Sequence, residues 1–138
     1  MEYQISATAL AQKDAKLHIK QSNIAFGTTE KTAGLLPNPA ELFLSSFAAC
    51  VLKNVERFSK LLHFEYDKAH ILVRATRLEK PPRMDDIHYE LTVFSRDTSL
   101  RPELLKKNIE KYGTIFNTIN KACTISGTIL KVEASEDI

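Results

Sequence analysis

The feature of the sequence that most constrains the fold is a stretch from Asn38-Pro39 to about Leu62 that contains no internal glycine or proline. Asparagine is a favourable N-cap, and proline suits the first helical position because no intrahelical amide bond is lost there. Glu41 lies in the first turn of this stretch, where the helix dipole stabilises a carboxylate. The sequence therefore predicts a long helix that begins at Asn38-Pro39.

The apolar residues of this stretch predict which sides of the helix are buried. They recur at steps of three and four residues, and the first half, through Val51, is apolar on nearly all sides. Such a pattern is typical of a helix that is buried on most of its surface, whereas the second half is amphipathic. The recurring residues are Phe43, Phe47, Cys50, Val51, Asn54, Val55, Phe58, Leu61 and Leu62.

Segments on both sides of the long helix alternate between apolar and polar residues, as expected of strands with one solvated face. Gln12-Lys13-Asp14 fits a hairpin turn, and a second helix is predicted to begin at Pro102. The order of elements indicates an α+β fold with antiparallel sheets, in a single domain that spans residues 1–138. The predicted strands are 1–9, 15–26, 68–79, 84–95 and 125–132, the second helix covers about 102–118, and residues 27–38 form a loop.

Composition and charge exclude several classes of protein. The chain has 138 residues, of which 43% are hydrophobic and 26% charged, and this is typical of a globular domain with its own core. The net charge of +2 is too small to indicate a nucleic-acid-binding surface. No apolar run approaches the roughly 18 residues of a membrane span, and residues 1–6 lack a signal-peptide pattern. We therefore expect a soluble, cytoplasmic protein that binds neither nucleic acid nor a membrane.

The chain has two cysteines, Cys50 and Cys123, which are too few and too far apart in sequence to suggest a disulfide scaffold. Neither lies in a C-x-x-C pair or near a histidine at ligand spacing, so the sequence predicts no metal site. Two interpretations remain. The cysteines are ordinary buried thiols, or one is a reactive thiol and the other its resolving partner.

The residues that lead to Cys50 carry a specific resemblance. The segment from Asn38 to Cys50, NPAELFLSSFAAC, is similar to the OsmC/Ohr pattern, in which N-P-E-E-L precedes a small-residue-rich helix that ends in A-A-C. A second family landmark is a cysteine between a helix and the last strand, and Cys123 occupies that place. The resemblance covers nearly the whole chain. It implies an OsmC-like fold with a long central buried helix that carries the first cysteine, assembled as an intertwined homodimer.

The resemblance also implies a chemistry for the two cysteines. Cys50 would be the peroxidatic residue, whose thiolate attacks an organic hydroperoxide, and Cys123 the resolving residue that closes a disulfide. An external dithiol reductant then resets the pair, and the chemistry needs no metal or organic cofactor. The sites of the family lie at the dimer interface, where Glu41, Ser46 and Phe47 would line or support the pocket.

The sequence departs from the family pattern at two places. The family has a glutamate ten positions before the helix cysteine, whereas this chain has Ala40 there and Glu41 one position later. At about 100° per residue, nine steps put Glu41 on the opposite side of a regular helix from Cys50. The family also has an arginine on an early strand, whereas the first arginine of this chain is Arg57.

These departures keep two further interpretations open. One is a binding protein of the same fold, with an apolar or acyl-type ligand at the dimer interface and both cysteines packed as small apolar residues. The other is a redox sensor that uses Cys50 and Cys123 without sustained turnover.

Overall fold

The computed structural model describes residues 1–133, and the chain divides into two compact units. The first unit is Met1–Phe43, and the second begins at Leu44. The long helix therefore starts in the first unit and continues into the second. The single domain expected from the sequence stays a prediction.

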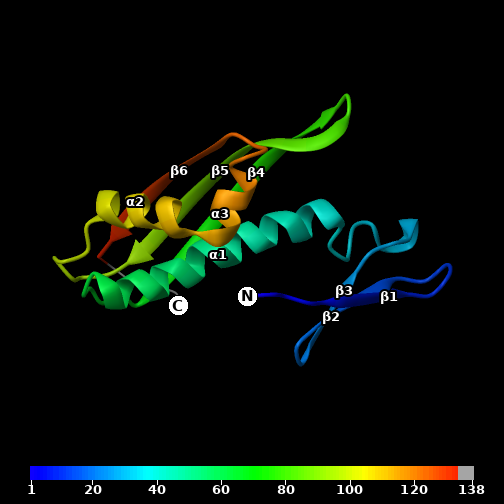
Figure 1. The fold of residues 1–138 in the computed structure, drawn as a ribbon, viewed down its shortest axis with the longest axis horizontal. Helices are drawn as coiled ribbons and strands as arrows, with labels where there is room; N and C mark the ends of the chain where they lie inside the picture. Colours follow the sequence, from blue (N-terminus) through cyan, green and yellow to red (C-terminus); the bar gives the residue numbers. More distant parts are fainter. Residues whose placement is uncertain (134–138) are drawn as a thin grey trace. The chain divides into compact units, whose positions relative to one another are not determined.

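Three short strands form the sheet of the first unit (Figure 1). They are β1 (Ser6–Ala9), β2 (Ala15–Ile19) and β3 (Ser22–Phe26), and neighbouring strands are antiparallel. The hairpin turn predicted at Gln12-Lys13-Asp14 is confirmed, because β1 and β2 pair on either side of it. The predicted strand 15–26 is instead two paired strands, since the chain turns at Lys20, whose φ is 52°.

The loop after β3 is fixed by one carboxylate. Asp14 Oδ1 accepts hydrogen bonds from the backbone N–H of Thr28 (3.0 Å), the backbone N–H of Thr29 (3.2 Å) and the hydroxyl of Thr32 (2.7 Å). These hydrogen bonds, that of Thr32 first among them, hold the pKa of Asp14 below its ordinary value. The predicted loop 27–38 therefore contains an ordered turn, the short helix η1 (Glu30–Thr32).

The second unit consists of one sheet and the helices that cover one of its faces (Figure 1). Its elements are α1 (Pro39–Leu61), β4 (Lys68–Glu79), β5 (Pro82–Phe94), α2 (Pro102–Tyr112), α3 (Thr114–Ile119) and β6 (Ile125–Val132). The sheet order is β4-β5-β6, with β4 antiparallel to β5 but β5 parallel to β6. The sequence predicts antiparallel sheets, and the parallel pair arises because the chain crosses back over the sheet through α2 and α3 before β6.

The single helix predicted over about 102–118 is instead two helices that separate at Gly113. The backbone of Gly113 is extended, with φ −70° and ψ 117°. The position is also crowded, since a Cβ there would lie 2.8 Å from the carbonyl oxygen of Ile109 and 3.1 Å from Cβ of Phe116. The apolar pattern of residues 102–118 does not reveal this break.

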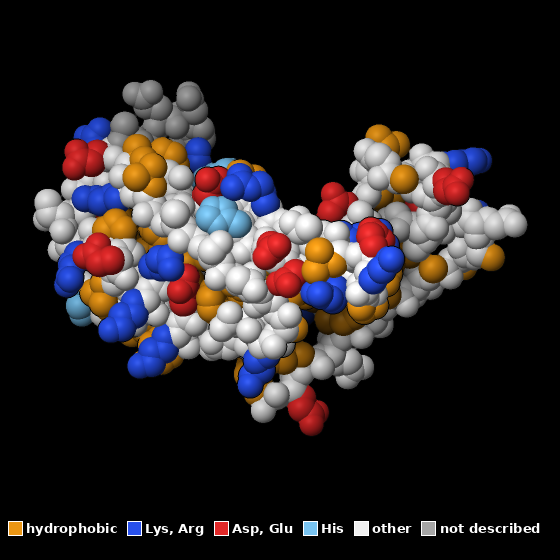
Figure 2. Space-filling model, turned by 90° about the horizontal axis from the view of Figure 1, so that it is seen from above, with side chains coloured by type: hydrophobic (Ala, Val, Ile, Leu, Met, Phe, Trp, Pro, Cys, Tyr) orange, Lys and Arg blue, Asp and Glu red, His pale blue; other side chains and the backbone are white. Residues whose placement is uncertain are grey.

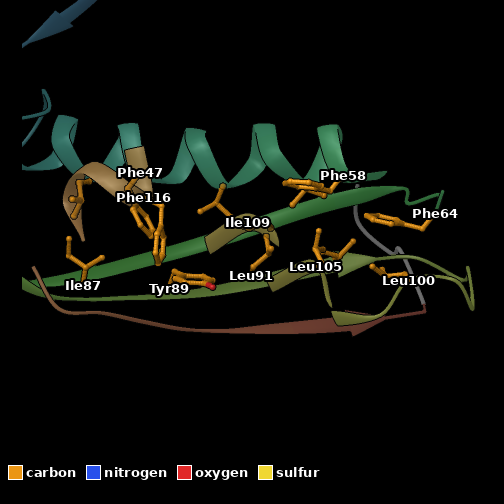
Figure 3. Packing of buried hydrophobic residues seen from close by; sticks show 14 residues of the cluster. Phe47, Phe58, Phe64, Ile87, Tyr89, Leu91, Leu100, Leu105, Ile109 and Phe116 are labelled. Atoms are coloured by element: carbon orange, nitrogen blue, oxygen red, sulfur yellow. The ribbon is translucent and has the colours of Figure 1, made fainter. Parts of the chain in front are cut away.

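The core of the second unit lies between its sheet and its helices (Figure 3). Alternate residues of β5, from Ile87 to Val93, point inward and are at most 1% exposed. This alternation is what a strand with one buried face requires. The β5 residues pack against Phe47, Val51, Val55 and Phe58 of α1, Leu105 and Ile109 of α2, and Phe116 and Ile119 of α3.

The first half of α1 is less buried in the single chain than its apolar pattern predicts. Phe47 and Val51 are fully buried, but Phe43 is 36% exposed, and Ser46 and Ala49 are exposed. The difference arises because one side of the helix contributes to the core of the second unit and the other side does not.

Tyr89 of β5 and Gly127 of β6 approach each other closely. The two residues are paired in the parallel register, and the tyrosine ring lies over the glycine. A Cβ on Gly127 would come within 3.0 Å of three atoms of that ring. The hydroxyl of Tyr89 donates to Glu110 Oε2 at 2.6 Å, and Lys106 Nζ pairs with the same oxygen at 2.9 Å. Burial raises the pKa of Tyr89, and the hydrogen bond to Glu110 raises it further.

Charged side chains of both signs are mixed on the face shown in Figure 2. Ion pairs such as Lys60–Glu56 (3.6 Å) and Arg74–Glu90 (3.4 Å) are exposed. Pairs of this kind contribute about 0–1 kcal/mol each, so the fold depends on its apolar core instead. Within residues 1–133, no helix is long and apolar enough to cross a membrane.

Candidate functional site

Cys50 lies on α1, one turn after the buried Phe47, and carries a half-buried free thiol. Asn54 follows one turn later and is only 8% exposed. Its side-chain amide donates to the carbonyl oxygen of Cys50 at 2.9 Å and lies 3.6 Å from the Cys50 sulfur. The sulfur therefore has an N–H donor beside it from its own helix.

The break between α2 and α3 supplies a second neighbour for this sulfur. A Cβ on Gly113 would lie 3.3 Å from Cys50 Sγ, so the glycine brings the backbone close to the sulfur. Phe116, just after the break, packs against Phe47, with 5.9 Å between the ring centroids. The Cys50 thiol thus has Asn54 of α1 and the Gly113 backbone as neighbours.

Cys123 lies between α3 and β6, in the place expected from the sequence. It is also a half-buried free thiol, and its S–H donates to the carbonyl oxygen of Met84 at 3.3 Å. The backbone N–H of the next residue, Thr124, donates to Asp85 Oδ1 at 2.8 Å. These bonds attach the segment around Cys123 to the first part of β5.

The surroundings of Cys123 disfavour its thiolate. Burial raises the pKa of the Cys123 thiol, and the carboxylate of Asp85 raises it further, while Arg83 acts in the opposite direction. A raised pKa keeps this thiol neutral near neutral pH, in the form that donates to Met84. Only the thiolate is a nucleophile, so this state is poorly suited to the first attack on a peroxide.

We expect Cys123 to react with iodoacetamide only at a higher pH than an ordinary cysteine does. A raised pKa in the folded state means that half of the Cys123 thiol is ionised only at a pH above the ordinary cysteine pKa. Mass spectrometry can follow alkylation of the Cys50→Ser protein from neutral to alkaline pH. The folded protein should reach half of its maximal alkylation rate at a higher pH than the same protein unfolded in urea. Asp85→Asn should move the folded profile downward. If the pH dependence of Cys123 alkylation is the same in the folded and the unfolded protein, the folded structure does not disfavour the Cys123 thiolate.

The two sulfurs have different neighbours. Within residues 1–133, Cys50 Sγ lies beside Asn54 and Gly113, whereas Cys123 Sγ bonds to the carbonyl oxygen of Met84. The two cysteines are not joined by a disulfide. Their action as a pair stays a prediction.

Glu41 and Asn38 form a reciprocal pair at the start of α1. The carboxylate of Glu41 accepts the backbone N–H of Asn38 at 3.0 Å, and Asn38 Oδ1 accepts the backbone N–H of Glu41 at 2.8 Å. Such a capping box satisfies two of the amide groups that a helix start leaves without partners. The predicted helix start at Asn38-Pro39 and the position of Glu41 in the first turn are confirmed, while its role in a pocket stays a prediction.

The other two candidate residues differ in burial. Ser46 is exposed on α1, whereas Phe47 is fully buried. The ring centroid of Phe47 lies 5.8 Å from that of Tyr89 and 5.9 Å from that of Phe116, so its side chain belongs to the core in the single chain. The roles of Ser46 and Phe47 in a pocket stay predictions.

Two neighbours of the Cys50 sulfur are absent from the residues predicted for the site. Asn54 has a signal in the sequence, because it is a polar residue on the buried side of the helix, one turn after the cysteine. Gly113 has none, since its approach to Cys50 joins distant parts of the chain. In the described part of the chain, no group of three or more His, Cys, Asp or Glu side chains is arranged to hold a metal ion.

Several solved structures share this fold. The OsmC-like protein from Mycoplasma pneumoniae superposes with a TM-score of 0.85 at 16% identity, over 96% of this chain and 99% of that chain. An organic hydroperoxide resistance protein from Elizabethkingia anophelis gives 0.70 at 13% identity, over 95% and 98%. The organic hydroperoxide resistance protein OsmC from Legionella pneumophila gives 0.66 at 14% identity, over 93% and 97%. At these identities the likeness defines the class of fold, which is OsmC-like.

The sequence defines the family as well. Residues 31–127 match the family described as OsmC-like protein, and this range is more than half of the chain. The chain therefore belongs to the OsmC-like protein family. No curated protein matches the sequence significantly. The resemblance drawn from the segment before Cys50 is thus confirmed for family and fold.

Proposed function

We propose that this protein is a thiol-dependent peroxidase that reduces organic hydroperoxides. The observation that carries the proposal is the Cys50 thiol, which is free, only half-buried and next to the amide of Asn54. Membership of the OsmC-like family supports the proposal, as do the solved neighbours that are named organic hydroperoxide resistance proteins.

In the first step, the Cys50 thiolate attacks the terminal oxygen of a hydroperoxide ROOH. A sulfur–oxygen bond forms, the O–O bond breaks, and the departing alkoxide takes up a proton to give the alcohol ROH. The sulfur is oxidised to a sulfenic acid, and the peroxide is reduced. Among the two cysteines, Cys50 is assigned this step because the environment of Cys123 disfavours its thiolate.

In the second step, the Cys123 thiol condenses with the sulfenic acid. A disulfide forms, and the sulfenic oxygen leaves as water. An external dithiol then reduces the disulfide by exchange and becomes a disulfide itself, which returns both thiols. This cycle requires no metal or organic cofactor, and two free thiols fit a reducing compartment such as the cytoplasm.

We expect the active form to be a homodimer. The first half of α1 carries small side chains that are exposed in the single chain, such as Ala49. A surface of this kind is stabilised when a second copy covers it. The measured mass in solution checks this expectation.

The direct test is consumption of cumene hydroperoxide with excess dihydrolipoamide. Wild type should turn over repeatedly, and Cys50→Ser should fall to the rate of buffer because the nucleophile is gone. Without the dithiol, Cys123→Ser should reduce at most about one equivalent of hydroperoxide per Cys50 thiol, since its sulfenic acid has no resolving thiol to condense with. If wild type and both variants all match buffer, the peroxidase proposal is wrong.

A second candidate is an OsmC-like protein that binds an apolar or acyl-type ligand. The observation in its favour is that Glu41 takes part in the capping box while Ala40 holds the position of the family glutamate. This candidate predicts no turnover and a ligand that native mass spectrometry detects on the purified protein.

A redox sensor would instead show one round of oxidation at Cys50 without sustained consumption of hydroperoxide.

A further inference from the structure

We propose that Asn54 is the positioning residue for the Cys50 thiolate. Its side-chain N–H group lies 3.6 Å from the sulfur and stabilises the negative charge that develops there. The inference deepens the proposed peroxidase and rests on it for the consequence in turnover. Its effect on the reactivity of the thiol is independent of any peroxide.

The orientation of the Asn54 amide is fixed by the main chain. The Cys50 carbonyl oxygen can only accept, so the group that approaches it to 2.9 Å must be the NH₂ end of the amide. A flipped amide would place two acceptor oxygens against each other. The same nitrogen that bonds to the carbonyl is therefore the one that faces the sulfur, and its two hydrogens allow it to serve both atoms.

The burial of Asn54 makes this donor effective. The side chain is 8% exposed, so water has little access to the side of the sulfur that the amide occupies. A hydrogen bond to an ionised acceptor is about twice as strong as one between neutral groups, and the difference grows as solvent is excluded. The amide thus stabilises the thiolate more than the thiol.

The other neighbour of the sulfur does not supply a competing donor. Gly113 has no side chain, and its backbone N–H donates to the carbonyl oxygen of Ile109 at 2.9 Å. Within residues 1–133, the Asn54 amide approaches Cys50 Sγ as a hydrogen-bond donor. When the thiol proton leaves to solvent, the charge on the sulfur therefore faces the Asn54 amide.

The chain offers a matched control. Asn108 on α2 donates from its amide to the carbonyl oxygen of Leu104 at 2.9 Å, which is the same bond that Asn54 makes to Cys50. Asn108 lies on a different helix from Cys50. Asn108→Leu therefore removes the same kind of helix side-chain bond as Asn54→Leu and leaves the sulfur untouched.

The experiment measures the pH profile of Cys50 alkylation by iodoacetamide in the full-length Cys123→Ser protein. Asn54→Leu should move the profile upward and slow reaction at neutral pH by roughly tenfold. Asn54→Ser should give a similar shift while it keeps a hydroxyl bond to the Cys50 carbonyl, so it serves if the leucine variant does not fold. Asn54→Gln, which retains an amide donor, should recover part of the reactivity, and Asn108→Leu should leave the profile unchanged.

The outcomes separate this inference from the peroxidase proposal. If folded Asn54→Leu or Asn54→Ser protein keeps the wild-type pH profile, or if Asn108→Leu shifts it equally, Asn54 has only a structural role and the inference is overturned. If wild type consumes no hydroperoxide but the Asn54 variants shift the profile as expected, the peroxidase proposal fails while the role of Asn54 stands. Loss of turnover in Asn54→Leu with the shifted profile supports both.

Discussion

Replacing Gly127 by alanine should destabilise the protein by about 3 kcal/mol or more, near or above the upper end of usual overpacking costs. The added Cβ would come within 3.0 Å of three atoms of the Tyr89 ring, and that ring is 0% exposed. The ring has little freedom to move away, because its hydroxyl is bonded to Glu110 at 2.6 Å and its centroid lies 5.8 Å from that of the Phe47 ring. Thermal unfolding followed by circular dichroism should show a fall in Tm of roughly 10 °C.

Gly34→Ala is the control for this substitution. A Cβ on Gly34 would meet nothing within 4 Å, and none of the glycines described has a positive φ. We therefore expect a Tm within a few degrees of wild type. If Gly127→Ala has the same Tm as Gly34→Ala, the close contact between Tyr89 and Gly127 does not limit the side chain at position 127.

Truncation of Phe47 to alanine should cost about 3–5 kcal/mol of unfolding free energy, the usual range for a buried phenylalanine. The side chain is 0% exposed and lies between the rings of Tyr89 and Phe116, with centroid distances of 5.8 and 5.9 Å. The cavity left behind is bordered by α1, β5 and α3, whose packing limits how far it can collapse. Urea unfolding should show a lower midpoint with an unchanged slope.

Phe47→Leu separates a role in the core from a role in substrate selection. Leucine keeps most of the apolar volume, so the loss should be about 1–2 kcal/mol. If Phe47 acts only through the core, the rate with cumene hydroperoxide per folded molecule should stay within about twofold of wild type. A large change in that rate without loss of stability would instead place Phe47 in contact with substrate.

Elements with strong local signals could be predicted from the sequence. The start of α1 follows from Asn38, Pro39 and Glu41, whose side-chain and backbone bonds are local to one turn. The bounds of β4 and β6 agree with the predicted ranges, since alternating apolar and polar residues mark strands with one buried face. The family followed from the motif before Cys50, because a motif depends on sequence alone.

What could not be predicted depends on long-range packing. The approach of Gly113 to Cys50 joins distant parts of the chain, and the parallel pairing of β6 follows from the path of the chain through α2 and α3. The turn at Lys20 lacks a glycine or asparagine signal, although its φ is 52°. At the site, burial of Asn54 follows from the helix pattern, but the direction of its amide toward the sulfur does not.

The parallel pairing of β5 with β6 has a consequence for folding during synthesis. The antiparallel hairpin of β4 and β5 can form as soon as Phe94 leaves the ribosome, whereas β6 pairs with β5 only after residues 95–124 have been made. Until then the outer edge of β5 is open, and Tyr89 lacks the strand that carries Gly127. At synthesis rates of about 5–20 residues per second this interval lasts a few seconds. An unpaired β5 edge during that time is the point at which a nascent chain is most exposed to wrong strand pairing.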